Sequence, residues 1–310
     1  MPMHAITAPT PGSGKTYLVD LAAAISSGAP CPVIAKGESP GELEKRLNTS
    51  LIAGHPMVSI DNVNGELKGD FLCHAIERPV TDIRILGRTK HARIQNAAVL
   101  FATGNNLRVV GDVVRRTLVC SIDPIVERPE LHRFIANPVK MVLDNRGKYI
   151  AAALTIVRAY LIADCPDIKK PVQLASFQPW SDTVRSSLMW LGCDDPILTM
   201  EKARDNDPEL EVLKDVVTAM ASEIGCGPSA ARTTAQIIGA AYATKDLRED
   251  RPLRDALDGL RQHGKSIDSL LLGQWLARHK DRVVANLQLT KKARGKNASE
   301  WYVEDLRQKK

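Results

Sequence analysis

The first 123 residues alternate short apolar runs with longer stretches of mixed polarity. Five runs have the length and composition of buried strands: 4–7, 32–35, 57–60, 98–102 and 117–122. Three stretches place apolar residues at helical spacing: 15–26, 41–52 and 65–76. Strands that alternate with helices through short connections predict an α/β domain built on a parallel sheet.

The pattern changes to helices alone after Pro129, with the clearest over 149–163, 181–191 and 209–224. Gly225, Gly227 and Pro228 form a cluster of helix-breaking residues that predicts a linker. Three further helices, over 230–242, 252–263 and 267–279, precede a strand-like stretch. We therefore expect a sheet domain over 1–135, a helical extension over 136–227 and a C-terminal domain over 228–310.

The composition is that of a multi-domain globular protein, with 310 residues of which 44% are hydrophobic. No apolar run approaches the roughly 20 residues that cross a bilayer, and the N-terminus lacks a basic segment followed by an apolar one. We therefore expect a cytoplasmic protein with no membrane partner. The six cysteines lie far apart, which argues against a disulfide framework or a zinc site and predicts reduced, mostly buried thiols.

Positive charge is concentrated at the C-terminal end. Residues 265–310 contain 11 Lys or Arg against 5 Asp or Glu, an excess equal to the net charge of +6 of the whole chain. This concentration indicates a polyanionic partner, most simply nucleic acid. A solvated basic tail is an equally good explanation of the charge alone.

Residues 9–16 read Pro-Thr-Pro-Gly-Ser-Gly-Lys-Thr and connect the first predicted strand to the first predicted helix. Glycines let the backbone turn its N–H groups around phosphate oxygens, and the following helix directs its positive end at the anion. Lys15 is expected to pair with the β and γ phosphates of ATP, and the Thr16 hydroxyl to ligate Mg²⁺. The rest of the expected cradle is Pro11, Gly12, Ser13 and Gly14. Pro9 stands where the usual pattern begins with glycine.

Two further predicted strands end in polar residues that could contact the same ATP and Mg²⁺. Asp61 ends an apolar strand about 45 residues after the loop, which suits a carboxylate in the magnesium shell. Asn62 stands where many ATPases with such a loop keep a glutamate that polarises the attacking water, so hydrolysis has no obvious base. Asn105, at the end of the next buried strand, is a candidate to contact the γ phosphate or position the water. A turn or helix cap is the alternative role for Asn105.

Arg115 and Arg116 precede the fifth predicted strand. An arginine that reaches into a neighbouring subunit's site is one way in which ATPases stabilise phosphoryl transfer. A local salt bridge to Asp112 is the alternative.

A β-hairpin is predicted just before the strand of Asn105. Residues 82–86 alternate polar and apolar side chains, Gly87 permits a turn, and 92–95 can return. Arg88, Lys90 and His91 would place positive charge at the tip, facing a DNA backbone. A merely solvated surface hairpin is the alternative.

The stretch from the loop to Arg116 resembles AAA+ ATPases, and within them the superfamily 3 helicases and the helicase modules of phage and mobile-element primase-helicases. Three features carry the resemblance: the compact spacing of the loop, Asp61 and Asn105; the basic hairpin; and the arginine pair that leads into a strand. It implies magnesium binding by Asp61 and a sensor role for Asn105. It implies an arginine finger at Arg116, with Arg115 as the alternative candidate. It also implies that Lys90 and His91 form the hairpin tip that contacts DNA. It covers about the first 135 residues, and Asn62 is the clearest departure.

The C-terminal region is expected to combine helices with a hairpin. Ser266 is suited to cap the helix 267–279, residues 282–289 alternate like a strand, 291–296 read as a turn, and 299–303 return. This arrangement resembles a winged-helix domain, whose wing would carry Lys291, Lys292, Arg294 and Lys296. Arg278, Lys280 and Arg282 would contact phosphates beside the wing, with an affinity that falls as salt rises. Packing on a partner protein is the alternative.

Together these features predict an ATP-dependent DNA helicase or translocase that acts in replication of a phage, plasmid or integrated mobile element. The resemblance implies a homo-oligomeric ring, expected to be a hexamer, with single-stranded DNA in its channel and duplex or fork DNA at the winged helix. Because the loop begins within a dozen residues of Met1, we expect a partner or a longer chain to supply a primase or initiator. An ATP-controlled loader or DNA-binding switch with slow hydrolysis is the alternative, and a small-molecule kinase is a third reading.

Overall fold

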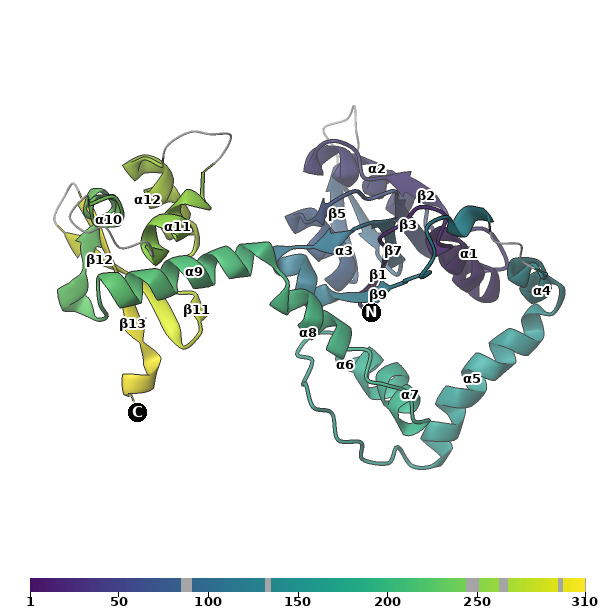
Figure 1. Cartoon of the computed structure of the whole chain (residues 1–310). Helices are drawn as coiled ribbons and strands as arrows, with labels where there is room; N and C mark the ends of the chain where they lie inside the picture. The colour runs from purple at the N-terminus through teal and green to yellow at the C-terminus, as the bar shows by residue number, and fades with distance from the viewer. Residues whose placement is uncertain (85–90, 132–134, 244–250, 262–266, 295–297, 310) are drawn as a thin grey trace. The chain divides into compact units, whose positions relative to one another are not determined.

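The computed structural model describes residues 1–84, 91–131, 135–243, 251–261, 267–294 and 298–309. The chain divides into two compact units, Met1–Asp207 and Pro208–Lys310 (Figure 1). Within the described ranges, no helix has both the length and the apolar character needed to traverse a bilayer. All six cysteines are free thiols, and Cys120, Cys165 and Cys193 are exposed, so the expectation of mostly buried thiols is wrong.

A five-stranded parallel sheet forms the core of the first unit, which confirms the predicted α/β fold. Its strands are β1 (Met3–Ala8), β2 (Val33–Ala35), β3 (Met57–Asp61), β7 (Val99–Asn105) and β9 (Thr117–Ser121). They run in the order β2–β3–β7–β1–β9, and every pairing is parallel. Because β7 lies between β1 and β3, the carboxyl ends of these three strands meet at one edge of the sheet.

Helices cover both faces of this sheet (Figure 1). On one face, α1 (Lys15–Ser26) packs Val19 and Ala23 against Ile6 and Phe101. On the other face, the buried side chains of α2 (Pro40–Ile52) and α3 (Asp70–Glu77) share a larger apolar cluster with Ala5. Neighbouring residues of β1 therefore point to opposite faces, as strand geometry requires.

The stretch 65–76, expected to be one helix, is divided. Glu66–Leu67 forms the short strand β4, which pairs in parallel with β8 (Arg108–Val109), and α3 begins only after Gly69. Gly69 has φ 147°, which helical residues do not adopt, so the helix starts five residues later than the apolar spacing indicates.

The predicted hairpin before β7 is present. β5 (Val80–Arg84) and β6 (His91–Gln95) pair antiparallel, with Arg84 opposite His91. Residues 85–90 between them, including Arg88 and Lys90, lie outside the described residues, as does the side chain of His91.

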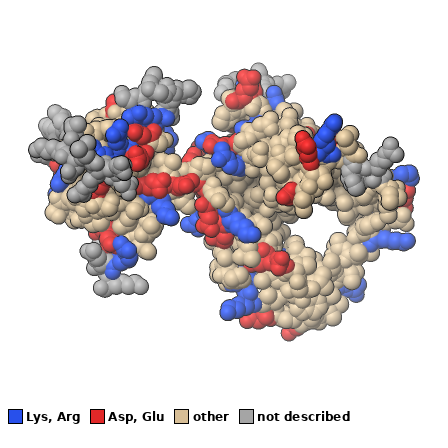
Figure 2. All heavy atoms as spheres, viewed as in Figure 1, with Lys and Arg blue, Asp and Glu red and all other residues tan. Residues whose placement is uncertain are grey.

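The middle of the chain is helical, as expected. It contains α4 (Pro138–Asp144), α5 (Arg146–Ile162), the consecutive segments α6 (Gln178–Trp180), η3 (Ser181–Arg185) and α7 (Ser186–Trp190), and α8 (Leu198–Asp205). In α5 Tyr160 is the single buried residue, although most side chains of the helix are apolar. Leu154, Leu161 and Ile162 are exposed, and the face drawn in Figure 2 shows few charged residues around α5 and α7.

The second unit combines helices with a four-stranded antiparallel sheet. Its helices are α9 (Pro208–Glu223), α10 (Thr234–Ala241), α11 (Pro252–Asp258) and α12 (Ser269–Arg278). Its strands are β10 (Arg232–Thr233), β11 (Val283–Val284), β12 (Leu287–Arg294) and β13 (Ala298–Asp305), in the order β10–β13–β12–β11. Leu213 of α9, Leu272 of α12 and Trp301 of β13 belong to its shared apolar core.

Two local expectations for this unit are wrong. The expected linker at 225–228 lies inside the unit, because the Gly227 N–H donates to the Val303 carbonyl and α9 packs on the sheet. The helix α12 is capped by Asp268, whose side chain accepts a hydrogen bond from the Leu271 N–H at 2.7 Å, rather than by Ser266, which lies outside the described residues.

Candidate functional site

The loop between β1 and α1 has the backbone shape of an anion cradle. Gly12 and Gly14 both adopt left-handed conformations, with φ of 72° and 83°. Gly14 caps α1 without a side-chain hydrogen bond, and the first turn of the helix contains no acidic residue. The N–H groups and the positive end of α1 are therefore available to a negatively charged ligand.

Lys15, the first residue of α1, is the cation at the centre of this loop. Its Nζ donates hydrogen bonds to the Thr10 carbonyl at 3.2 Å, to Ser13 Oγ at 2.9 Å and to Asn105 Oδ1 at 2.8 Å. Its side chain is buried, and this burial lowers the pKa of Lys15, while the negative charge of Asp61 acts in the opposite direction. The contact with Asn105 joins two elements 90 residues apart in sequence.

Asp61, the last residue of β3, lies opposite the start of α1. Its Oδ1 accepts hydrogen bonds from Thr16 Oγ1 at 3.2 Å and from Thr103 Oγ1. Thr103 is buried in β7 and was missed by the sequence analysis. The available signal was a hydroxyl in an otherwise apolar strand, at the position two residues before Asn105.

These side chains line one pocket with a volume of about 500 Å³. Its lining residues are Pro11, Gly12, Ser13, Gly14, Lys15, Thr16, Tyr17, Asp61, Asn62, Thr103, Gly104 and Asn105. The structure thus brings together every loop residue proposed from the sequence with Asp61 and Asn105. Asp61 is the one carboxylate in this lining; Asn62, in a left-handed conformation with φ 55°, contributes an amide.

The position of Asn105 is fixed by a close approach of two backbone segments. A Cβ atom at Gly104 would lie 1.9 Å from the Val63 carbonyl oxygen, so only glycine fits here. The Val63 N–H also donates to the Thr103 carbonyl at 2.8 Å. The segment after Asp61 is thereby held against the end of β7, and this contact sets the spacing between Asp61 and Asn105.

The two candidate finger arginines end the short 3-10 helix η1 (Gly111–Arg116). Arg116 is buried and donates to Glu77 Oε2 at 2.6 and 3.0 Å and to the Asp112 carbonyl at 2.7 Å. This burial disagrees with an arginine that projects into a neighbouring subunit. Arg115 is half exposed, and its Nε lies 2.5 Å from Asp112 Oδ1, which is the local salt bridge considered as the alternative.

The carboxylates around these arginines are held ionised. Hydrogen bonds from Ser176 and Arg116 lower the pKa of Glu77, and the hydrogen bond from Arg115 lowers the pKa of Asp112. Neither arginine lines the pocket of Lys15 within this chain. The arrangement is that of an ion-pair network between α3 and η1.

The basic residues expected in a wing turn lie mostly in a strand. Lys291, Lys292 and Arg294 belong to β12, which pairs with β13 through Arg294 opposite Ala298. In this pairing Lys291 lies opposite Trp301, with its ammonium 5.6 Å from the ring centroid. Lys296 and the side chain of Arg294 lie outside the described residues.

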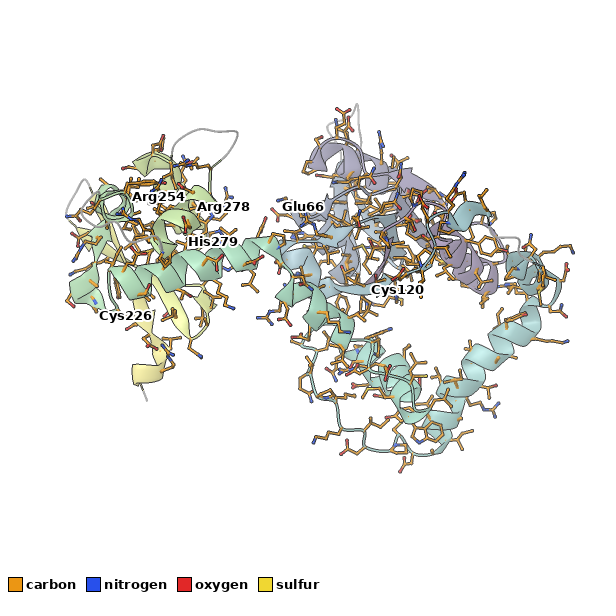
Figure 3. The ribbon with its side chains drawn as sticks, in the orientation of Figure 1. Glu66, Cys120, Cys226, Arg254, Arg278 and His279 are labelled. Atoms are coloured by element: carbon orange, nitrogen blue, oxygen red, sulfur yellow. The ribbon has the colours of Figure 1, made fainter. Side chains whose placement is uncertain are left out.

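The helix α12 ends beside a buried histidine in the same unit (Figure 3). The ring of His279 lies 4.5 Å from that of Trp275, and its Nδ1 lies 3.0 Å from an Arg282 guanidinium nitrogen. Burial and the neighbouring charges of Arg282 and Arg278 lower the pKa of His279 to about 4. Arg282 therefore contacts protein, while Arg278 and Lys280 remain exposed.

The fold and the site define a parallel α/β unit with a polar pocket at the carboxyl edge of its sheet, followed by a helical region and an antiparallel C-terminal sheet. No protein-family model matches the sequence, and a search of curated proteins finds no match. Among solved structures, the chain is similar to two A-form apo structures of the NrS-1 C-terminal region.

One of these alignments has a TM-score of 0.39 and 14% identity and covers 97% of this chain and 66% of that chain. The other has a TM-score of 0.31 and 17% identity and covers 48% of this chain and 34% of that chain. The chain thus spans less than two thirds of the length of either matched structure. At these TM-scores and identities, the similarity carries no conclusion about activity.

Proposed function

We propose that the pocket of Lys15 binds a nucleoside triphosphate, ATP, together with Mg²⁺. The observation that carries the proposal is the convergence of Lys15, Thr16, Asp61 and Asn105 from three separate elements on one pocket. The left-handed glycines and uncapped start of α1 suit phosphate oxygens. A hydroxyl and a carboxylate 3.2 Å apart are the hard oxygen ligands that Mg²⁺ prefers.

Each residue then has a separate role in the reaction. Lys15 neutralises charge on the terminal phosphates, and the N–H groups of 12–16 hold them in place. Thr16 and Asp61 would ligate the metal, which supplies charge neutralisation when bound, and Thr103 orients the Asp61 carboxylate. Asn105 is placed to orient a water or a phosphate oxygen through its amide.

We further propose that ATP hydrolysis drives movement along DNA, as a helicase or translocase in replication of a phage, plasmid or integrated element. The support is the basic hairpin β5–β6 and the second basic hairpin β12–β13, together with the resemblance of the first 135 residues to ring-forming helicases. In a hexameric ring, Lys90 and His91 would face the central strand. Lys291, Lys292, Arg294 and Lys296 would contact duplex or fork DNA.

A nucleotide-controlled loader or DNA-binding switch is the second candidate, and one observation favours it. Asp61 is the single carboxylate in the pocket lining, and both hydroxyl contacts on it are consistent with a metal-binding role. Asn62 cannot accept a proton from water at neutral pH. A site with this lining binds ATP and turns it over slowly unless a neighbouring subunit supplies a base.

ATPase and unwinding assays separate the two candidates. Turnover is measured with and without single-stranded DNA, beside unwinding of a forked duplex. A helicase shows turnover stimulated by DNA and strand separation; a switch shows ATP-dependent DNA binding or assembly with slow turnover and no separation. Absence of Mg-ATP binding by calorimetry rejects both candidates.

Mixed oligomers test whether a neighbour completes the site. If Arg115 acts in trans, Arg115→Ala subunits mixed with Lys15→Ala subunits regain turnover, because each supplies what the other lacks. The same mixture made with Arg116→Ala distinguishes the exposed arginine from the buried one. If neither mixture regains turnover, the site is not shared between subunits.

A further inference from the structure

A second pocket opens at the same carboxyl edge of the parallel sheet, on the side of β9. Its volume is about 450 Å³. Its lining is contributed by β1 and β9, by β8 with the residue before it, and by α8 with the residue after it: Thr7, Leu107, Arg108, Val109, Val119, Ser121, Thr199, Lys202, Ala203 and Asn206. None of these residues lines the pocket of Lys15.

Two cations, Arg108 and Lys202, line this pocket. Arg108 on β8 and Lys202 on α8 are exposed, and neither forms an ion pair with any residue that the structure describes. The acid placed opposite Arg108 in the β4–β8 register is Glu66, but its carboxylate pairs with Lys68 at 3.2 Å. Among the residues that the structure describes, the positive charges of Arg108 and Lys202 are therefore not matched by an ion pair.

Neutral polar groups stand beside the cations. Thr7 Oγ1 accepts a hydrogen bond from the Leu107 N–H at 3.0 Å, which leaves its hydroxyl proton to donate. The Ser121 hydroxyl is exposed at the end of β9, with no described hydrogen-bond partner. The Thr199 hydroxyl, in contrast, has no free proton for a ligand, because it donates to the Pro196 carbonyl while it accepts from the Val119 N–H.

The remaining lining is one amide, Asn206, which donates to the Lys202 carbonyl at 2.8 Å, and an apolar wall. Leu107 and Val109 are buried, and Val119 and Ala203 are partly buried beside them. A ligand of this pocket thus meets two cations and two free hydroxyl donors next to an apolar wall. That combination suits a phosphate group attached to a sugar or a base, since phosphate accepts several charge-assisted hydrogen bonds at once.

We propose that this pocket binds a phosphate group of a nucleotide or of a nucleic-acid strand, with Arg108 and Lys202 as its cationic ligands and Thr7 and Ser121 as hydroxyl donors. A pocket of about 450 Å³ has the size of a small-molecule site. Its place outside the carboxyl ends of parallel strands is where open α/β sheets bind ligands. The site is independent of Lys15, so it does not require the ATP site to function.

The pocket is connected to the first site through the backbone. Leu107 and Arg108 follow Asn105 after a single residue, Asn106, whose N–H donates to the Ala8 carbonyl. Thr7 of the second pocket and Ala8 are neighbours at the end of β1. An anion on Arg108 therefore binds three residues away from Asn105 in the chain.

The test uses the full chain with Lys15→Ala, so that the first site contributes little phosphate binding. Binding of thymidine 5′-monophosphate and of a short oligothymidylate is measured by calorimetry in low salt. Arg108→Gln and Lys202→Gln are each added to this background, and Arg204→Gln is the matched control, because Arg204 is exposed on α8 but does not line the pocket. Thermal unfolding verifies that each variant is folded.

Loss of one charge-assisted contact is expected to weaken binding of at least one probe about tenfold, with no change for Arg204→Gln. An effect on the mononucleotide identifies a free nucleotide as the ligand, and an effect on the oligonucleotide alone identifies a strand. The proposal is overturned if neither probe binds. It is equally overturned if Arg108→Gln and Lys202→Gln match the Arg204→Gln control for both probes.

Discussion

The two units hold their positive charge in different ways. In the first unit, the Lys15 ammonium is buried and already donates to three protein oxygens at 2.8–3.2 Å, and its partners come from the loop and from β7. In the second unit, Lys291 and Lys292 are exposed on one strand, and Lys291 lies over the Trp301 ring. A converging, pre-organised cation favours one ligand geometry, whereas exposed cations along a strand favour any extended polyanion.

This contrast predicts that the two units respond differently to the same kind of change. Removing the Lys15 ammonium from the first unit should abolish its specific contact with a bound phosphate. Removing lysines from the second unit should weaken DNA binding by an amount that grows with the number of positive charges removed.

Lys15→Ala should weaken Mg-ATP binding about 1,000-fold, because about two charge-assisted hydrogen bonds to phosphate are lost. DNA binding by the second unit should be unchanged in the absence of nucleotide. Calorimetry with Mg-ATP and a fluorescence-anisotropy assay with DNA measure the two effects. Lys45→Ala, at an exposed position on α2, is the control. An equal loss of Mg-ATP affinity in both variants would show that Lys15 has no specific role in binding.

Gly104→Ala should destabilise the first unit by about 3 kcal/mol, since the added methyl group meets the Val63 carbonyl at 1.9 Å and the backbone must move. Chemical denaturation, monitored separately for each unit by hydrogen exchange, measures the change. Gly147→Ala is the control: it lies in α5 with no atom within 4 Å of the new Cβ, and it should be neutral or stabilising. Equal stability of the two variants would show that the contact at Val63 is not tight.

Acid should destabilise the second unit through His279. Its folded pKa of about 4 lies below the ordinary value of 6.5, so the unfolded chain binds the proton more readily between these values. The stabilisation is complete above pH 6.5 and is lost as pH falls toward 4, by about 2 kcal/mol between pH 7 and pH 5. NMR titration of the ring measures the pKa, and His279→Gln should flatten the stability profile over this range. A ring that titrates near 6.5 contradicts the prediction.

Replacing Lys291 and Lys292 together with glutamine should weaken DNA binding about tenfold and reduce the salt dependence by about two counterions. ATP binding should not change. Anisotropy titrations at several salt concentrations measure both quantities, with Lys214→Gln on α9 as the control for net charge. An unchanged salt slope would show that these lysines do not contact phosphates.

The fold of the first unit was predictable because its strands and helices have local signatures. The helix Lys15–Ser26 begins and ends as its apolar spacing indicates, and each of the five sheet strands was predicted as an apolar run. Within the pocket, the loop, Asp61 and Asn105 follow from residue type and position after a strand. Their meeting at one edge follows from parallel pairing alone.

Features that depend on contacts between distant residues were not predictable. Thr103 and Gly104 gain their roles from Asp61 and from the Val63 carbonyl, some forty residues away. Arg116 was expected to project outward, but Glu77 on α3 holds it inside. The sequence does not predict the second pocket, because Arg108 and Lys202 lie far apart in the chain and belong to no continuous motif.

The contact between Lys15 and Asn105 has a consequence for any anion that enters the pocket. The ammonium already donates to three protein oxygens, so an incoming anion replaces at least one of them, and Asn105 Oδ1 at 2.8 Å is the partner that lies outside the loop. If that partner is the one replaced, ligand binding at the loop frees the Asn105 side chain at the end of β7. β7 ends at Asn105 and β8 begins at Arg108, so only two residues separate the side chain that contacts Lys15 from the arginine of the second pocket.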